Sequence, residues 1–88
     1  MIPTAQVSEN DASSPLPNRT WVHVQSSNLD WIWYDYDIQQ LKVQFVGGNV
    51  YGYAGVPKEK VIAMLLASSK GSYFYHNIRT AYPYGLHQ

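Results

Sequence analysis

The sequence predicts a small α+β domain in which a four-stranded antiparallel sheet, a meander, precedes two helices that cover one of its faces. Two observations lead to this fold class. Short segments in which apolar and polar residues alternate fill the first half of the folded region, and this alternation is typical of strands with one buried face. After Pro57 the apolar residues take a helical spacing instead.

Four alternating segments are predicted as strands: residues 21–25, 29–34, 41–45 and 50–54. Ser26-Ser27-Asn28 breaks the first pair with turn chemistry, and a Gly47-Gly48 turn joins the last pair. In the second strand, Ile32 and Tyr34 share one face, and Trp31 and Trp33 share the other. In the third strand, Leu41, Val43 and Phe45 face the core. The strands therefore form a sheet whose helix-covered face is apolar.

The turn between the last two strands decides where Tyr51 and Tyr53 point. With a two-residue Gly47-Gly48 turn, both tyrosines share the outer face of the sheet with Lys42 and Gln44. A three-residue turn shifts the pairing by one residue and sends both to the core side. Gly-Gly favours the shorter turn, so we expect Tyr51 and Tyr53 on the outer face or at its rim.

Pro57 suits the first position of a helix, and a broad apolar surface follows it: Val61, Ile62, Met64, Leu65 and Leu66. This surface exceeds what one sheet face needs, so we expect a second subunit to cover part of it. Gly71 is expected to end this helix, and Ser72 to cap a second helix that stops near Tyr82, before Pro83.

The chain is expected to divide into a disordered, mobile N-terminal arm (residues 1–20), one folded domain (residues 21–84) and a short tail (residues 85–88). The arm is polar and poor in large apolar residues, so it buries too little surface to offset its ordering entropy. The sequence has no cysteine, which excludes disulfides and thiolate–zinc sites. A domain of this size gains little stability from its core alone, and we expect a homo-oligomer.

Charge and hydropathy exclude several partners. Six basic residues balance six acidic ones, whereas proteins that hold duplex DNA by charge carry a basic surplus. No signal peptide and no apolar run long enough to span a bilayer is present. We therefore expect no duplex DNA, no membrane and a cytoplasmic location.

The sequence lacks the usual arrangements for catalysis: a nucleophile elbow, a glycine-rich phosphate loop or paired carboxylates. Its histidines, His23, His76 and His87, are scattered, which argues against a metal site. We expect a protein that is not an enzyme and that has no cofactor.

Tyr51, Tyr53 and Arg79 are the main candidates for contact with a ligand. Aligned tyrosines stack on bases, and the alternative is that they pack as a cross-strand pair. Arg79 lies one helical turn from Tyr75, where its guanidinium suits a phosphate or carboxylate. The alternative is an arginine that stacks on tyrosine and pairs with Asp35 or Asp37.

Ser26, Ser27 and Ser69 are candidates to donate hydrogen bonds to a phosphate, although such serines more often close turns. Trp31 and Trp33 project together from the sheet. Two exposed tryptophans indicate an interface or a ligand wall, and we expect them, with Leu66, to form a subunit interface.

Several spaced motifs together resemble the KTSC domain over residues 22–84: Ser26-Ser27, Ile32, Tyr34-Asp35, Leu41-x-Val43-x-Phe45, Tyr51-x-Tyr53, Val56-Pro57, Ser69-x-Gly71, Phe74 and Ile78-Arg79. This small domain occurs at the C-terminus of some lysyl-tRNA synthetases and alone in bacterial and phage proteins. The resemblance implies RNA binding as a suggested role, and Tyr34 joins the expected ligand set with its motif. The chain departs from the family pattern at Trp33, which replaces glycine, and at Tyr75, which replaces asparagine.

We therefore expect a non-catalytic binding module for single-stranded RNA or a small nucleotide, including the capture of a nucleotide signal in a phage setting. The alternative is a protein–protein interaction or self-assembly module with no small-molecule ligand.

Overall fold

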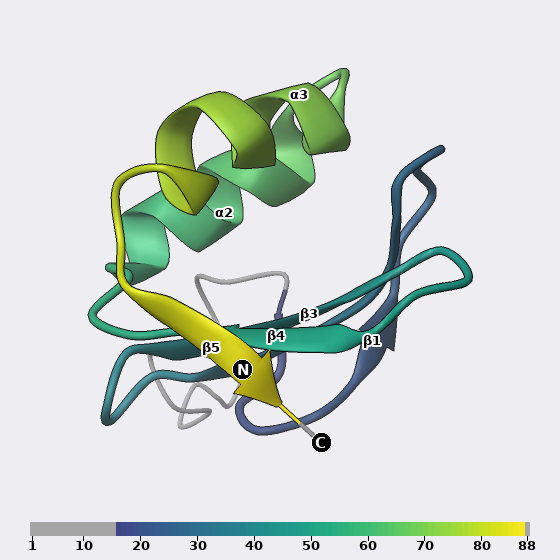
Figure 1. Ribbon diagram of the computed structural model, residues 1–88. Coiled ribbons are helices and arrows are strands. Elements are labelled where there is room, and N and C mark those ends of the chain that lie inside the picture. Colours follow the sequence, from purple (N-terminus) through teal and green to yellow (C-terminus); the bar gives the residue numbers. More distant parts are fainter. Residues whose placement is uncertain (1–15, 88) are drawn as a thin grey trace, which may run out of the picture.

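The computed structural model describes residues 16–87. One layer is an antiparallel sheet with strand order β1-β2-β3-β4-β5, and the helices form a second layer over one face of it (Figure 1). The elements are β1 (Val22–His23), β2 (Leu29–Asp35), β3 (Gln40–Phe45), β4 (Val50–Tyr53), α2 (Lys58–Leu66), α3 (Lys70–Phe74), the π-helix η1 (Tyr75–Arg79) and β5 (Tyr84–His87). The predicted α+β fold is confirmed, with five strands in place of four.

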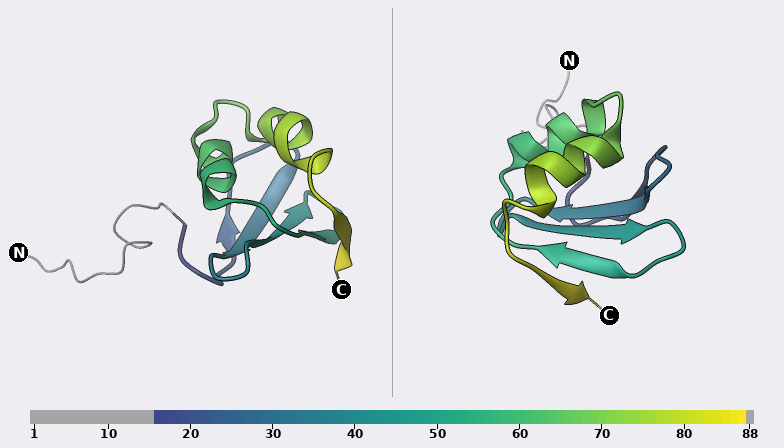
Figure 2. Two further views of the ribbon diagram at one scale, coloured as in Figure 1. Left: turned by 90° about the vertical axis from the view of Figure 1, so that its left-hand side faces the viewer. Right: turned by 45° about the horizontal axis from the view of Figure 1, so that its top comes forward.

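The additional strand, β5, comes from the end of the predicted domain and from the predicted tail. After the helices, the Pro83 carbonyl accepts a hydrogen bond of 3.0 Å from the Ala54 amide, which brings the chain back to the free edge of β4. Tyr84 then pairs with Tyr53, and Leu86 pairs with Tyr51. Figure 2 shows β5 at the edge of the sheet. Four residues are too few to show a strand pattern in the sequence. They form a strand because the free edge of β4 pairs with them.

The core lies between the sheet and the helices. Its fully buried side chains alternate along the strands and recur along the helical face: Leu16, Leu29, Ile32, Tyr34, Leu41, Val43, Tyr53, Val56, Val61, Met64, Phe74 and Ile78. The predicted inward direction of Leu41 and Val43 is confirmed. On α2 only Val61 and Met64 are buried, and Leu66 is 74% exposed.

The prediction that Tyr51 and Tyr53 lie on the outer face is wrong. The Phe45 amide donates to the Asn49 carbonyl (3.4 Å), so three residues, 46–48, form the loop. Gly47 has a φ of +66°, a conformation that favours glycine. Leu41 pairs with Tyr53 and Val43 with Tyr51, which turns both rings to the core side.

The boundary between the two helices also differs from the prediction. The first helix, α2, ends at Leu66, and Ser69 rather than Ser72 caps the next, because its Oγ accepts from the Ser72 amide (3.4 Å). Gly71 lies inside α3. A Cβ there would come within 2.9 Å of Asn28 Oδ1, so glycine allows α3 to approach the β1–β2 loop closely.

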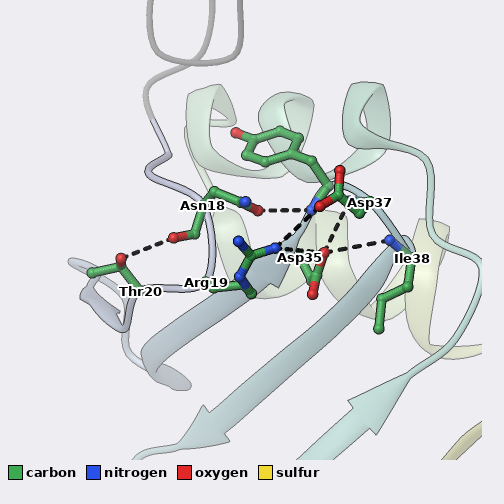
Figure 3. Close-up of polar contacts among 7 residues, drawn as sticks. Asn18, Arg19, Thr20, Asp35, Asp37 and Ile38 are labelled. Carbon is green, nitrogen blue, oxygen red and sulfur yellow. Dashed lines mark hydrogen bonds and ion pairs between the residues drawn. The ribbon is translucent and has the colours of Figure 1, made fainter. Parts of the chain in front are cut away.

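Part of the segment predicted as an arm packs on the domain. Leu16 is 1% exposed, and the Asn18 Oδ1 accepts from the Tyr36 amide (2.9 Å). Figure 3 shows Arg19 between Asp35 and Asp37, with its Nη1 at 3.6 and 3.1 Å from their carboxylates. The domain therefore includes residues 16–20, and the rest of the predicted arm, residues 1–15, lies outside the described residues.

The burial of Leu16 predicts its contribution to stability. We expect Leu16→Ala to lower the free energy of unfolding by about 2–5 kcal/mol, because it removes buried methyl groups and leaves a cavity. Urea denaturation measures this change. Leu66→Ala is the matched control, and its exposed side chain predicts a change within about 0.5 kcal/mol. Equal effects of the two variants would contradict the packing of Leu16 in the core.

The Tyr34 hydroxyl is buried and donates to the Val56 carbonyl, so Tyr34→Phe leaves this carbonyl without its partner. We expect a loss of about 1–3 kcal/mol in the free energy of unfolding. Tyr75→Phe, at a ring that is 51% exposed, is the control and is expected to have little effect.

The same tyrosine predicts a dependence of stability on alkaline pH. Burial first, with the neighbouring charge of Glu59 among the smaller causes, raises the pKa of Tyr34 to about 12. The neutral Tyr34 phenol stabilises the folded state fully below its pKa in the unfolded chain, about 10, and this stabilisation is lost as the pH rises through about 12. Between these pH values, the free energy of unfolding, measured by urea denaturation, should decrease less steeply with pH for Tyr34→Phe than for the parent protein. The same pH dependence in both proteins would argue against the raised pKa.

Candidate ligand-binding site

A concavity of about 560 Å³ lies between the β1–β2 loop, the end of β3 and the α3–η1 segment. Its volume is in the range of small-molecule sites. Polar and aromatic residues line it: Ser27, Asn28, Leu29, Phe45, Val46, Ser69, Gly71, Ser72, Phe74, Tyr75, His76 and Arg79. We call it the main pocket. Its wall includes no carboxylate.

Arg79, at the end of η1, supplies the permanent positive charge of the main pocket. Its guanidinium carbon lies 4.9 Å from the centre of the Tyr75 ring. The two residues are four apart on one helical face, which places the cation over the ring. The alternative pairing with Asp35 or Asp37 does not occur. These carboxylates contact Arg19 at the Gln40 end of the β2–β3 pair, whereas Arg79 lies at the Phe45 end. None of the ion pairs between described residues involves Arg79.

Aromatic rings form the apolar wall of this pocket and hold the helical layer on the sheet. Phe74 is buried and contacts Phe45 and Tyr53 edge to face, with ring centres at 5.7 and 5.3 Å. Tyr75 is half exposed and meets His76 at 5.3 Å. Phe74 therefore anchors the segment, and the next turn presents Tyr75, His76 and Arg79 to solvent.

A second concavity, of about 290 Å³, adjoins the first, and we call it the side pocket. Phe45, Tyr51, Tyr53, Arg79 and Tyr84 line it. Three predicted ligand residues, Tyr51, Tyr53 and Arg79, therefore meet here, although the tyrosines arrive from the core side. Burial raises the pKa of Tyr53, and the charge of Arg79 opposes part of this rise.

The predicted serines divide between the pocket and the turn. Ser27 and Ser69 line the main pocket. Ser26 does not, because its Oγ accepts hydrogen bonds of 3.2 Å from the Asn28 and Leu29 amides and so closes the β1–β2 turn. Ser26 is a structural residue in this fold.

Tyr34 lies apart from Arg79. Its ring is fully buried, and its hydroxyl is bound to the Val56 carbonyl. The concavity next to it, of about 300 Å³, is lined by a different set of side chains: Tyr36, Asp37, Gln39, Lys58 and Glu59. Tyr34 therefore does not join the other predicted ligand residues.

The three predicted interface residues lie on two different layers. Trp31 and Trp33 project from the outer face of the sheet, where Trp31 packs against His23 and Lys42 lies 4.0 Å over the Trp33 ring centre. Leu66 lies on α2, in the helical layer over the other face (Figure 1). Of the two departures from the KTSC pattern, Tyr75 lines the main pocket and Trp33 lies away from it.

Sequence reasoning missed Asn28 and Tyr84 as wall residues. Asn28 enters the main pocket because α3 approaches the β1–β2 loop at Gly71, a contact between distant segments. Tyr84 enters the side pocket on β5, a strand too short to show a clear pattern in the sequence.

Two further expectations concern metals and membranes. In residues 16–87, no group of three histidine or acidic side chains is placed to hold a metal ion. No helix within this range has the length and apolarity needed to cross a bilayer.

Comparison with known proteins gives a consistent family. The KTSC domain model matches residues 25–82. An uncharacterised protein from Stutzerimonas stutzeri (strain A1501) is 45% identical over 53 residues, an alignment that covers 60% of this chain and 75% of that protein. The crystal structure of a KTSC domain protein from Yersinia pestis superposes with a TM-score of 0.75 at 30% identity, covering 78% of this chain and 97% of that one. The chain belongs to the KTSC domain family.

Proposed function

We propose that this domain is a non-catalytic binding module for a nucleotide, either free or as part of a short single-stranded RNA. The observation that carries the proposal is Arg79, a guanidinium with no carboxylate partner among the described residues, held over an aromatic ring at the main pocket. A guanidinium offers a rigid fork of donors that matches phosphate oxygens.

The rest of the wall fits a base and its sugar. Tyr75 is 51% exposed and stands beside Arg79, so a flat base has a ring on which to stack. Ser27, Asn28 and Ser69 bring hydroxyl and amide groups to the same concavity. Such groups pair with the polar edges of a base and with ribose hydroxyls.

One feature favours binding without catalysis, and another favours a small ligand. The main pocket has no carboxylate and no cysteine in its wall, so two of the side-chain types that commonly act as general acid, base or nucleophile are missing from it. The net charge of the chain is zero, and a small ligand needs only the local charge of Arg79, whereas a long nucleic acid needs a basic surface.

A thermal-shift screen with nucleoside monophosphates and short oligoribonucleotides tests this proposal. We expect at least one of them to raise the melting temperature, and Arg79→Ala to abolish the rise because the phosphate loses its partner. Arg19→Ala, which removes a guanidinium already paired with Asp35 and Asp37, is the matched control and should keep the rise. The proposal fails if no nucleotide or oligonucleotide shifts the melting temperature at millimolar concentration.

A second candidate function is self-assembly through the outer face of the sheet. Trp31 is 38% exposed on this face. Beside it, the pairs Trp33–Lys42, Lys42–Gly52 and Gly52–Gly85 form a row across four strands, in which the Gln40 side chain lies over Gly52. An exposed tryptophan ring on an outer sheet face suits the packing of a second copy.

Sedimentation velocity tests this second function. Self-assembly through the outer face predicts a dimer at micromolar concentration that Trp33→Ser dissociates. Leu66→Ser changes an exposed apolar side chain in the helical layer and should leave the dimer intact. A monomer at several hundred micromolar would rule out this function.

A further inference from the structure

The main pocket and the side pocket share two wall residues, Phe45 and Arg79. Their volumes are about 560 and 290 Å³. The two concavities are therefore neighbours, and a ligand that fills both must pass the Arg79 guanidinium. This arrangement restricts the class of ligand more sharply than either pocket does alone.

The side pocket is an aromatic site. The Tyr53 and Tyr84 rings stack at 5.5 Å with an angle of 28° between their planes, and Tyr51 meets Tyr84 at 5.9 Å. Tyr84 is 60% exposed, so much of its ring remains open to solvent. Apart from Arg79, this wall carries no charged side chain. Its chemistry suits a flat ring and does not suit a second phosphate.

The main pocket provides a second site for a flat ring, on the other side of Arg79. It has an exposed ring, Tyr75, and the polar groups of Ser27 and Asn28. The order across the surface is thus a ring site, one guanidinium and a second ring site. A nucleoside triphosphate fits this order poorly, because it brings several negative charges to one arginine and leaves the side pocket empty.

We propose that the preferred ligand is a dinucleotide whose bridging phosphate binds Arg79 and whose two bases occupy the main pocket and the side pocket. This inference rests on the proposed nucleotide-binding function and adds to it the number of bases and the place of the phosphate. A linear diribonucleotide carries one such bridging phosphate, and a cyclic dinucleotide carries two, one of which would bind Arg79.

Isothermal titration calorimetry on the full chain tests the inference with adenosine monophosphate, linear adenylyl-adenosine and cyclic diadenylate. We expect the better of the two dinucleotides to bind about 5- to 150-fold more tightly than the mononucleotide, the gain that one additional stacked base provides. The affinities for the linear and the cyclic dinucleotide, compared with each other, show which of the two the site prefers.

Tyr84→Ser separates the two pockets. This variant is expected to reduce the affinity for the dinucleotide to about the level of the mononucleotide, because Tyr84 lines the side pocket and does not line the main pocket. Tyr84→Phe keeps the ring and should keep the affinity. Trp31→Ser, which removes an exposed ring from the outer sheet face, should leave the affinities for the mononucleotide and the dinucleotides unchanged.

The outcomes distinguish this inference from the function on which it rests. Mononucleotide and dinucleotides of equal affinity would overturn the inference and leave nucleotide binding in place. A dinucleotide that binds more tightly than the mononucleotide, but whose affinity Tyr84→Ser does not change, would also overturn the inference. The absence of binding by all three compounds at millimolar concentration would overturn both. The comparison of ligands on the parent protein decides the question even if the Tyr84→Ser chain does not fold.

Discussion

The pairing of Val43 with Tyr51 and of Leu41 with Tyr53 is the constraint on which the rest of the domain depends. It turns both tyrosines toward the helical layer, where Tyr53 packs against Phe74. Because side chains alternate along a strand, a slip of one residue would send both rings to the outer face. Phe74 would then lose a partner, and the side pocket would lose two of its walls.

The same aromatic contacts place the charged group of the site. Phe74 and Ile78 are buried under the helical segment, and they fix the rotation of η1 against the sheet. Arg79, one residue beyond Ile78, is thereby held at the boundary of the two concavities. Asp35 and Asp37 lie at the other end of the β2–β3 pair, where both contact Arg19 (Figure 3). A domain with no cysteine thus uses one set of packed rings for stability and for the shape of its site.

Sequence reasoning identified Arg79, Ser27 and Ser69 as ligand candidates, and the structure places all three around the main pocket. It also selected Ser26, whose Oγ accepts from two backbone amides, and Tyr34, whose hydroxyl donates to a backbone carbonyl. Ser69 has both roles, because it lines the pocket while its Oγ accepts from the Ser72 amide. A sequence displays the chemical type of a side chain. Whether its polar atom remains available depends on which backbone group the fold brings next to it.

The amino-acid sequence by itself determined the α+β class, the first four strands and the inward direction of residues such as Val43, because alternation and helical spacing are local patterns. Only the tertiary structure decided the register of the last hairpin, the formation of β5 and the meeting of Tyr51, Tyr53 and Arg79. These depend on contacts between distant segments. The loop amide of Val46 binds the Asn28 carbonyl (2.9 Å), and this contact holds the three-residue loop that Gly47-Gly48 by itself does not specify.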